Sequence, residues 1–309
     1  MPSEASAAAP RALSSGTLRG MGWMLLTGLL FVGVTGIVRH LGSDMSAPQA
    51  AFIRYAFGIL LLAPILLRLR MTDLASSRLG LHALRGLVHG IAVILWFYAM
   101  ARIPIAEVTA LGYTAPIFTT VGAALFLGEV LRLRRIVAVL IGFAGTLVIL
   151  RPGIIEVELG ALAQLTAAPL FAASFLLAKK LTETEESGSI VALMSIFVTL
   201  TLLPPALLAW RTPTWEETFW LFMTAVLATL GHYTLVRAFR AAELTVTQPI
   251  SFLQLVWATL LGLTMFDEQP DLWTWVGAGI IVASATYIAH REAMAKGPKA
   301  STTAPLQSS

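Results

Sequence analysis

Ten long apolar stretches, separated by short polar breaks, constrain the fold of this 309-residue chain more than any other feature. A helix needs about 20 apolar residues to cross the hydrocarbon core of a bilayer. The stretches cover residues 21–38, 47–67, 84–101, 105–128, 135–150, 159–178, 189–209, 217–236, 244–265 and 273–290. Only 12% of the residues are charged, against about 25% in soluble domains. We therefore expect an all-α integral membrane protein with ten transmembrane helices.

The distribution of basic residues predicts how these stretches cross the membrane, because cytoplasmic loops carry an excess of Lys and Arg. With the N-terminus inside, the cytoplasmic segments hold Arg11, Arg19, Arg68, Arg70, Arg78, Arg85, Arg132, Arg134, Arg135, Lys179, Lys180, Arg237, Arg240, Arg291, Lys296 and Lys299. The outer segments hold only Arg39, Arg102, Arg151 and Arg211. The pattern predicts a multi-pass protein of the inner (plasma) membrane with both termini in the cytoplasm.

Several kinds of chemistry have no sequence pattern here. The chain has no cysteine, so disulfides and thiolate ligands are excluded. It contains no H-E-x-x-H, no G-x-S-x-G and no G-x-x-x-x-G-K-[ST] motif. No basic run alternates with aromatic residues as in nucleic-acid binding. We expect no enzymatic activity, cofactor, metal or nucleic-acid partner, and the expected partners are a small-molecule metabolite and the lipid bilayer.

The sequence contains an internal repeat. Glu129 closes the fourth stretch and Glu268 closes the ninth, and "FYAMARIPIAEVTA" (97–110) resembles "HYTLVRAFRAAELTV" (232–246). The chain thus divides into five-span halves, residues 20–151 and 158–290, flanked by tails 1–19 and 291–309 that we expect to be disordered. An odd number of spans makes the second half enter the membrane from the opposite side. Inverted repeats of this kind are typical of secondary transporters with a central site between the halves.

The same segments carry a family resemblance. "FIRY" (52–55), "ARIPIAEVTALGYTAPIFTTVGAALFLGE" (101–129), "GFAGTLVILRPG" (142–153) and "GHYTLVRAF" (231–239) resemble the ten-span EamA-type group of the drug/metabolite transporter superfamily. This resemblance covers nearly the whole chain outside the tails. It implies two inverted five-helix repeats and the transport of a small organic metabolite. One departure is that Leu255 stands where the first half has Pro116, with the second-half proline earlier, at Pro249.

Arg54 is the only Lys or Arg that lies well inside a stretch, about seven residues from its start and roughly 10 Å deep. It can clamp an anionic group of a substrate, or it can bond to carbonyls or a carboxylate of a neighbouring helix. Because the resemblance implies an arginine here across many substrates, we favour the structural role.

Polar and aromatic residues within spans are the candidates for a substrate site, because such groups usually face a bundle interior or a wet cavity. The substrate-binding candidates are His89, Trp96, Tyr113, Gln164, His232, Tyr233, Gln248, Gln254 and Trp257. His89 and Trp96 are seven residues apart and share one helical face. Each of these histidines and tryptophans can alternatively bond to or pack against a neighbouring helix. We expect Trp257→Ala to weaken transport.

Glu129 and Glu268 are interpreted as structural rather than proton-coupling residues. A carboxylate at a helix C-terminus opposes the helix dipole and needs a compensating partner. We expect each to cap the next helix or to pair across the short turn. The glycine pairs Gly142/Gly145 and Gly277/Gly279 predict close helix approach, but they do not establish a homodimer.

The predicted function is a secondary transporter that moves an amino acid or a related zwitterionic or heteroaromatic solute by alternating access, with export favoured. The alternative is uptake of a vitamin or nucleoside-like compound, such as riboflavin or S-adenosylmethionine. A lipid-carrier flippase is a third hypothesis. Facilitated diffusion, exchange and histidine-assisted proton antiport all remain open as mechanisms.

Overall fold

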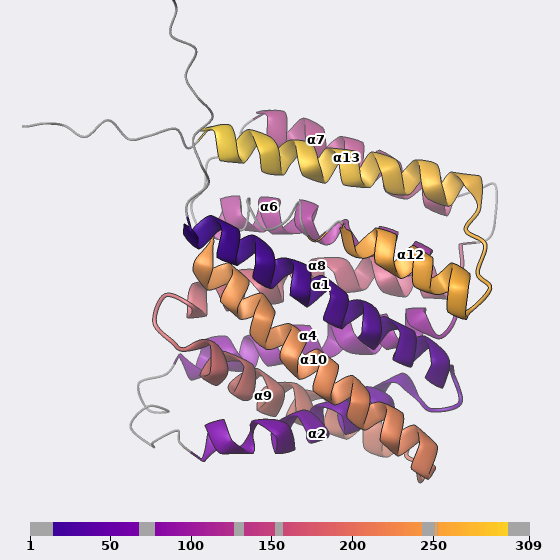
Figure 1. The fold of residues 1–309 in the computed structure, drawn as a ribbon. Helices are drawn as coiled ribbons and strands as arrows, with labels where there is room; N and C mark the ends of the chain where they lie inside the picture. The colour runs from indigo at the N-terminus through magenta and orange to yellow at the C-terminus, as the bar shows by residue number, and fades with distance from the viewer. Residues whose placement is uncertain are drawn as a thin grey trace, which may run out of the picture.

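The computed structural model describes residues 15–67, 78–126, 133–151, 157–242, 251 and 253–295, and the regular structure within them is helical throughout (Figure 1). The helices are α1 (Ser15–Leu41), α2 (Ala47–Leu66), α4 (Leu79–Met100), α5 (Ile105–Gly112), α6 (Ala115–Phe126), α7 (Leu133–Leu150), α8 (Leu159–Leu181), α9 (Ser187–Leu208), α10 (Trp215–Ala241), α12 (Leu253–Met265) and α13 (Leu272–Ala295). They confirm the all-α membrane fold.

Most of the expected spans appear as single helices. The helices α1, α2, α4, α8, α9 and α10 are each long and apolar enough to cross a membrane. Shorter apolar stretches at residues 140–149, 253–265 and 272–284 lie in α7, α12 and α13, where the fifth, ninth and tenth spans are expected. The start of the ninth span, residues 244–250, lies outside the described residues.

The fourth expected span (105–128) differs, because it is divided into α5 and α6. The break falls at Tyr113 and Thr114, whose amides donate to the carbonyls three residues earlier, and the Thr114 hydroxyl donates to the Leu111 carbonyl at 2.7 Å. Pro116 follows, and it has no N–H to continue the ladder back to Gly112. The sequence predicted the span but not its interruption in the middle.

The packing of helices follows the inverted repeat. Among contacts between the two halves, the most extensive are α1 with α10, α4 with α8, α2 with α9, and α7 with α13. By order in the repeat, α1 corresponds to α8 and α4 corresponds to α10, so exchanging the halves turns the α1–α10 pair into the α8–α4 pair. The α2–α9 and α7–α13 pairs each join two corresponding helices, so the exchange leaves them unchanged. The helices of one half therefore pack mainly across the repeat boundary, as a pseudo-two-fold arrangement requires.

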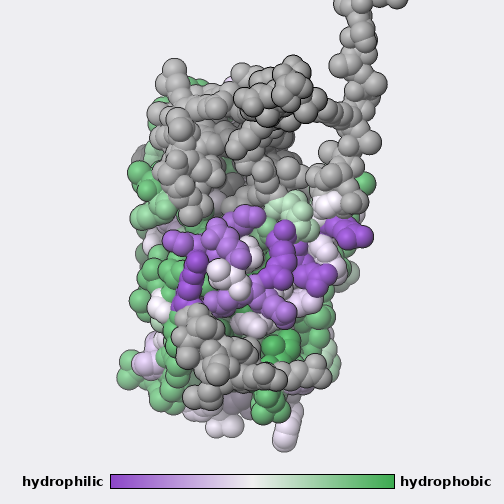
Figure 2. All heavy atoms as spheres, turned by 90° about the vertical axis from the view of Figure 1, so that its left-hand side faces the viewer, coloured by the Kyte–Doolittle hydropathy of each residue, from purple (hydrophilic) through white to green (hydrophobic). Residues whose placement is uncertain are grey.

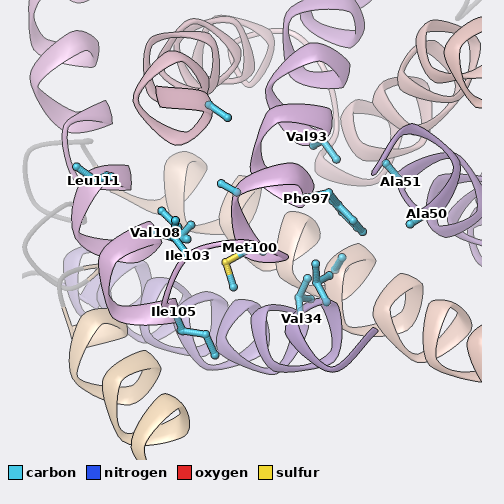
Figure 3. Packing of buried hydrophobic residues seen from close by; sticks show 14 of the residues in the cluster. Val34, Ala50, Ala51, Val93, Phe97, Met100, Ile103, Ile105, Val108 and Leu111 are labelled. Atoms are coloured by element: carbon cyan, nitrogen blue, oxygen red, sulfur yellow. The ribbon is translucent and has the colours of Figure 1, made fainter. Parts of the chain in front are cut away.

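Buried apolar side chains hold the centre of the bundle together near the turn between α4 and α5 (Figure 3). Met100, Ile103 and Ile105 are at most 1% exposed at this turn. Figure 3 shows them with Val34 of α1, which belongs to the same cluster. The same cluster includes Ala161, Met194 and Leu221 of the second half, so it joins both halves toward the end where the outer arginines are predicted.

The opposite end of the bundle is polar. In Figure 1 the described part of α1 begins on the left-hand side, and the described part of α13 ends on the same side. Figure 2 views that side and shows hydrophilic residues gathered between apolar flanks. Arg240 donates to the carbonyl of Glu185 there, and His82 lies 2.7 Å from the Glu185 carboxylate. This is the end that the basic residues predict to face the cytoplasm.

Candidate substrate-binding cavity

A cavity of about 220 Å³ lies between the two halves and is lined by α1, α2, α4, α5, α6, α8, α10 and α12. Its walls are strongly aromatic, with Phe31, Trp96, Phe97, Phe171, Phe175 and Phe239. Polar side chains interrupt these walls at a few places. A largely apolar cavity with few convergent polar groups is the usual form of a small-molecule site.

Arg54 supplies positive charge to this cavity. It is 6% exposed, and its guanidinium carbon lies 4.0 Å from the centre of the Tyr55 ring. Among the described residues that line the cavity, none is Asp or Glu, and no ion pair of Arg54 occurs in that part of the chain. The structure therefore places Arg54 at the cavity, without a carboxylate partner among the described residues.

Two buried histidines face each other across the boundary between the halves. The ring centroids of His89 on α4 and His232 on α10 are 5.1 Å apart, with an interplanar angle of 72°. Phe171 packs edge-on against His89, and Phe31 packs in the same way against His232. The His89 Nδ1 lies 3.0 Å from the Ser174 hydroxyl of α8. Three helices and two aromatic rings thus hold the pair in place.

The interrupted fourth span also contacts the second half. The Tyr113 hydroxyl donates to the Ser251 carbonyl at 2.9 Å, and both residues line the cavity. Thr27 of α1 and Thr234 of α10 share a hydrogen bond of 2.8 Å. A break in a membrane helix is tolerated where the backbone lies within protein or lines a cavity, as it does at Tyr113.

Most of the sequence-derived candidates converge on this cavity. Six line it: His89, Trp96, Tyr113, Gln164, His232 and Gln254. Trp257 does not, because its side chain is 42% exposed on the outside of α12. Tyr233 also lies apart, where its hydroxyl accepts from Arg237 at 3.3 Å. Tyr233 directly follows the cavity residue His232, and a rotation of about 100° per residue turns its side chain away from the cavity. Gln248 lies outside the described residues.

None of the phenylalanines of the walls is among the substrate-binding candidates predicted from the sequence. Phe31 lies four residues after Thr27 and four before Thr35, and all three line the cavity. Phe171 and Phe175 are likewise four apart on α8. Spacing of four places side chains on one helical face, so this signal was present.

Glu268 has partners other than those expected. Its Oε2 accepts from the backbone N–H of Ile105 at 2.7 Å, and its Oε1 lies 2.7 Å from Arg39 Nε. Glu268 therefore caps α5 of the opposite half rather than the helix that follows it. The following helix, α13, is capped by Asp271, which accepts from the Thr274 amide at 2.7 Å. Glu129 lies outside the described residues.

Comparisons with known proteins agree with this architecture. A model of the EamA-like transporter family matches residues 18–151 and again residues 158–289. A solved crystal structure matches with a TM-score of 0.63 at 18% identity, covering 92% of this chain and all of that one, which supports the fold alone.

Curated relatives align over most of the chain. The riboflavin transporter of Vibrio cholerae is 31% identical over 89% of this chain and 94% of its own length. The S-adenosylmethionine uptake transporter of Rickettsia conorii is 30% identical over 91% and 96%. The riboflavin transporter of Rhizobium johnstonii is 30% identical over 87% and 90%.

Proposed function

Because this chain belongs to the EamA-like transporter family, we propose that it takes up an uncharged heteroaromatic metabolite of the riboflavin type. Transport proceeds by alternating access around the cavity between the inverted halves. The sequence favoured amino-acid export and gave uptake of a vitamin or nucleoside-like compound as the alternative. The proposal adopts this alternative. Relatives named for riboflavin and for S-adenosylmethionine uptake support this choice.

The observation that carries the proposal is Arg54, a buried cation at a cavity whose described lining has no carboxylate. S-adenosylmethionine bears a sulfonium and an ammonium against one carboxylate, and an amino acid bears an ammonium beside its carboxylate. A substrate cation roughly 8 Å from Arg54 would be repelled by about 2 kcal/mol at an effective dielectric constant of ~20. A flavin carries no cation and offers ring carbonyl oxygens and ring nitrogens as acceptors for the guanidinium.

The walls suit a flat ring system. Phe31 and Phe171 pack against the histidine pair, and Trp96 lines the same cavity. Aromatic pairs contribute about 0.5–1.5 kcal/mol beyond the burial of their area. The volume of about 220 Å³ is below the ~300–1,000 Å³ usual for drug-sized ligands. We infer that the cavity holds the ring system and widens along the transport path for the rest of the molecule.

The test is flux into proteoliposomes that contain the purified protein, with labelled riboflavin, S-adenosylmethionine and a set of amino acids in parallel. We expect saturable riboflavin flux, competition by lumiflavin, which is the ring system without its ribityl chain, and no competition by ribitol. Empty liposomes are the control. Saturable flux of S-adenosylmethionine or of an amino acid without riboflavin flux would refute the proposal. Lipid scrambling without solute flux would instead support the flippase hypothesis.

A further inference from the structure

Three side chains that line the cavity each carry a buried polar atom without a hydrogen-bond partner among the described residues. The atoms are His89 Nε2, His232 Nδ1 and Gln164 Oε1. The residues are 2%, 6% and 2% exposed, respectively. Roughly nine in ten buried polar groups in proteins are paired, and leaving one unpaired costs about 1–3 kcal/mol. Three such atoms around one cavity indicate groups that a ligand satisfies.

The two histidine atoms belong to one unit. The Ser174 hydroxyl engages His89 at Nδ1, which leaves Nε2 as the unpaired ring atom. The His232 ring lies 5.1 Å away, fixed by Phe31. A neutral imidazole has one donor nitrogen and one acceptor nitrogen. Two neutral rings can therefore present a donor and an acceptor side by side.

On this basis we propose that His89 and His232 determine specificity by binding the imide edge of the substrate, where a ring N–H stands beside a carbonyl. The inference rests on the proposed function and names the part of the substrate that is recognised. One imidazole accepts from the imide N–H, and the other donates to the adjacent carbonyl. Arg54 and Arg85 are the charged groups near the pair in the described structure. They favour an uncharged, acceptor-rich edge over an ammonium group.

Gln164 lies at a different part of the cavity. It is ten residues from Ser174 on α8, which corresponds to about 15 Å along the helix. Its side-chain amide faces Gly112 of α5, where a Cβ atom would come within 2.9 Å of the Gln164 nitrogen. Its unpaired oxygen can accept from a hydroxyl group. The site thus fits a heterocycle with an imide edge at one end and a hydroxylated chain toward Gln164.

The experiment measures binding to the purified full-length protein of two probe pairs that differ only in the imide N–H. The pairs are riboflavin with 3-methylriboflavin, and uridine with 3-methyluridine. His89→Asn retains a polar group for Ser174 but removes the Nε2 position, and His232→Phe retains the ring contact with Phe31. His40→Gln is the matched control, since His40 is half-exposed and does not line the cavity.

In the unmodified protein we expect the N–H form of a pair to bind at least about tenfold more tightly than the methylated form. In His89→Asn and His232→Phe this ratio falls to roughly one to three, while His40→Gln keeps it. A purely structural role would weaken both members of a pair equally and leave the ratio unchanged, and that result overturns the inference. Equal binding of both members by the unmodified protein, or binding of neither pair, also overturns it.

The two proposals can fail separately. Discrimination within the uridine pair that the histidine variants lose, without riboflavin flux, supports the inference and refutes the flavin substrate. Riboflavin flux with no discrimination within either pair supports the flavin substrate and refutes the role of the histidines.

Discussion

Glu268 and Arg39, which come from opposite halves of the chain, form an ion pair with 2.7 Å between Oε1 and Nε. The same carboxylate accepts from the Ile105 amide, and Arg39 donates to the Met100 carbonyl at 3.0 Å. The connection joins α1, the α4–α5 turn and the start of the segment leading to α13. It lies beside the apolar layer of Met100, Ile103 and Ile105 and ties the halves together at the predicted outer end.

Removing the charge of Glu268 is expected to destabilise the protein. The Glu268 side chain is 7% exposed, and breaking a buried ion pair by removing one partner costs about 3–5 kcal/mol. Glu268→Gln leaves an oxygen for Ile105, so we expect the lower end of that range in denaturant unfolding. Asp271→Asn is the control. The Asp271 side chain, which pairs with Arg151, is 41% exposed, and exposed ion pairs contribute only about 0–1 kcal/mol to the free energy of unfolding. Equal losses in the two variants would contradict this prediction.

Arg54 is expected to be required for substrate binding. Arg54→Gln removes a charge-assisted donor worth about 1.5–3 kcal/mol, which corresponds to roughly ten- to hundredfold in affinity. Arg54→Lys retains the charge without the planar fork, so we expect an intermediate loss. The measurement is substrate affinity in proteoliposomes, with protein amount determined separately. The exposed Arg102, which stacks on Tyr98 away from the cavity, provides the control Arg102→Gln. An unchanged affinity in Arg54→Gln would remove Arg54 from the site.

The two tryptophans predicted from the sequence are expected to behave differently. Trp96 lines the cavity, whereas Trp257 is 42% exposed outside it. Trp96→Ala is expected to raise KM at least about fivefold through loss of aromatic contact with the substrate. Trp257→Ala is expected to leave KM unchanged, which reverses the prediction from the sequence alone. Transport kinetics of the two variants decide between these expectations.

Close packing of α7 against α13 is expected to depend on Gly277. A Cβ atom at Gly277 would come within 2.7 Å of the Gly145 carbonyl oxygen, whereas one at Gly279 would meet no atom within 4 Å. Gly277→Ala is therefore expected to destabilise the protein by about 1–3 kcal/mol through overpacking. Gly279→Ala is expected to be neutral or to stabilise by up to about 1 kcal/mol through helix propensity. Thermal unfolding of both variants in the same detergent checks this difference.

Asp271 is expected to contribute a pH-dependent part of the stability. Burial acts to raise its pKa, but hydrogen bonds from Thr274 and the nearby Arg151 outweigh it, so the pKa of Asp271 is lowered. A lowered folded-state pKa stabilises the protein above the unfolded value of about 3.9, and this contribution is lost as the pH falls through the folded value. Asp271→Asn should lack this contribution, so its stability should converge with that of the unmodified protein at low pH. Parallel stability curves down to pH 3 would contradict the assignment.

The sequence predicted the spans, the repeat and six of the cavity residues for a common physical reason. Apolar length is set by bilayer thickness, and polar side chains within spans turn inward because lipid cannot hydrogen-bond them. His89, Gln164 and His232 follow this rule, and each is at most 6% exposed. Trp257 does not, because an aromatic side chain is equally stable facing lipid or a cavity, and composition does not choose between them.

The amino-acid sequence alone determined the all-α membrane architecture, its ten spans and its two related halves, since these follow from hydropathy and internal similarity along the chain. The tertiary structure decided which residues from the two halves meet. It paired Glu268 with Arg39 and Ile105, set His89 beside His232, and placed Arg54 at the cavity. Such pairings depend on the packing of helices more than a hundred residues apart, and no local pattern in the sequence specifies that packing.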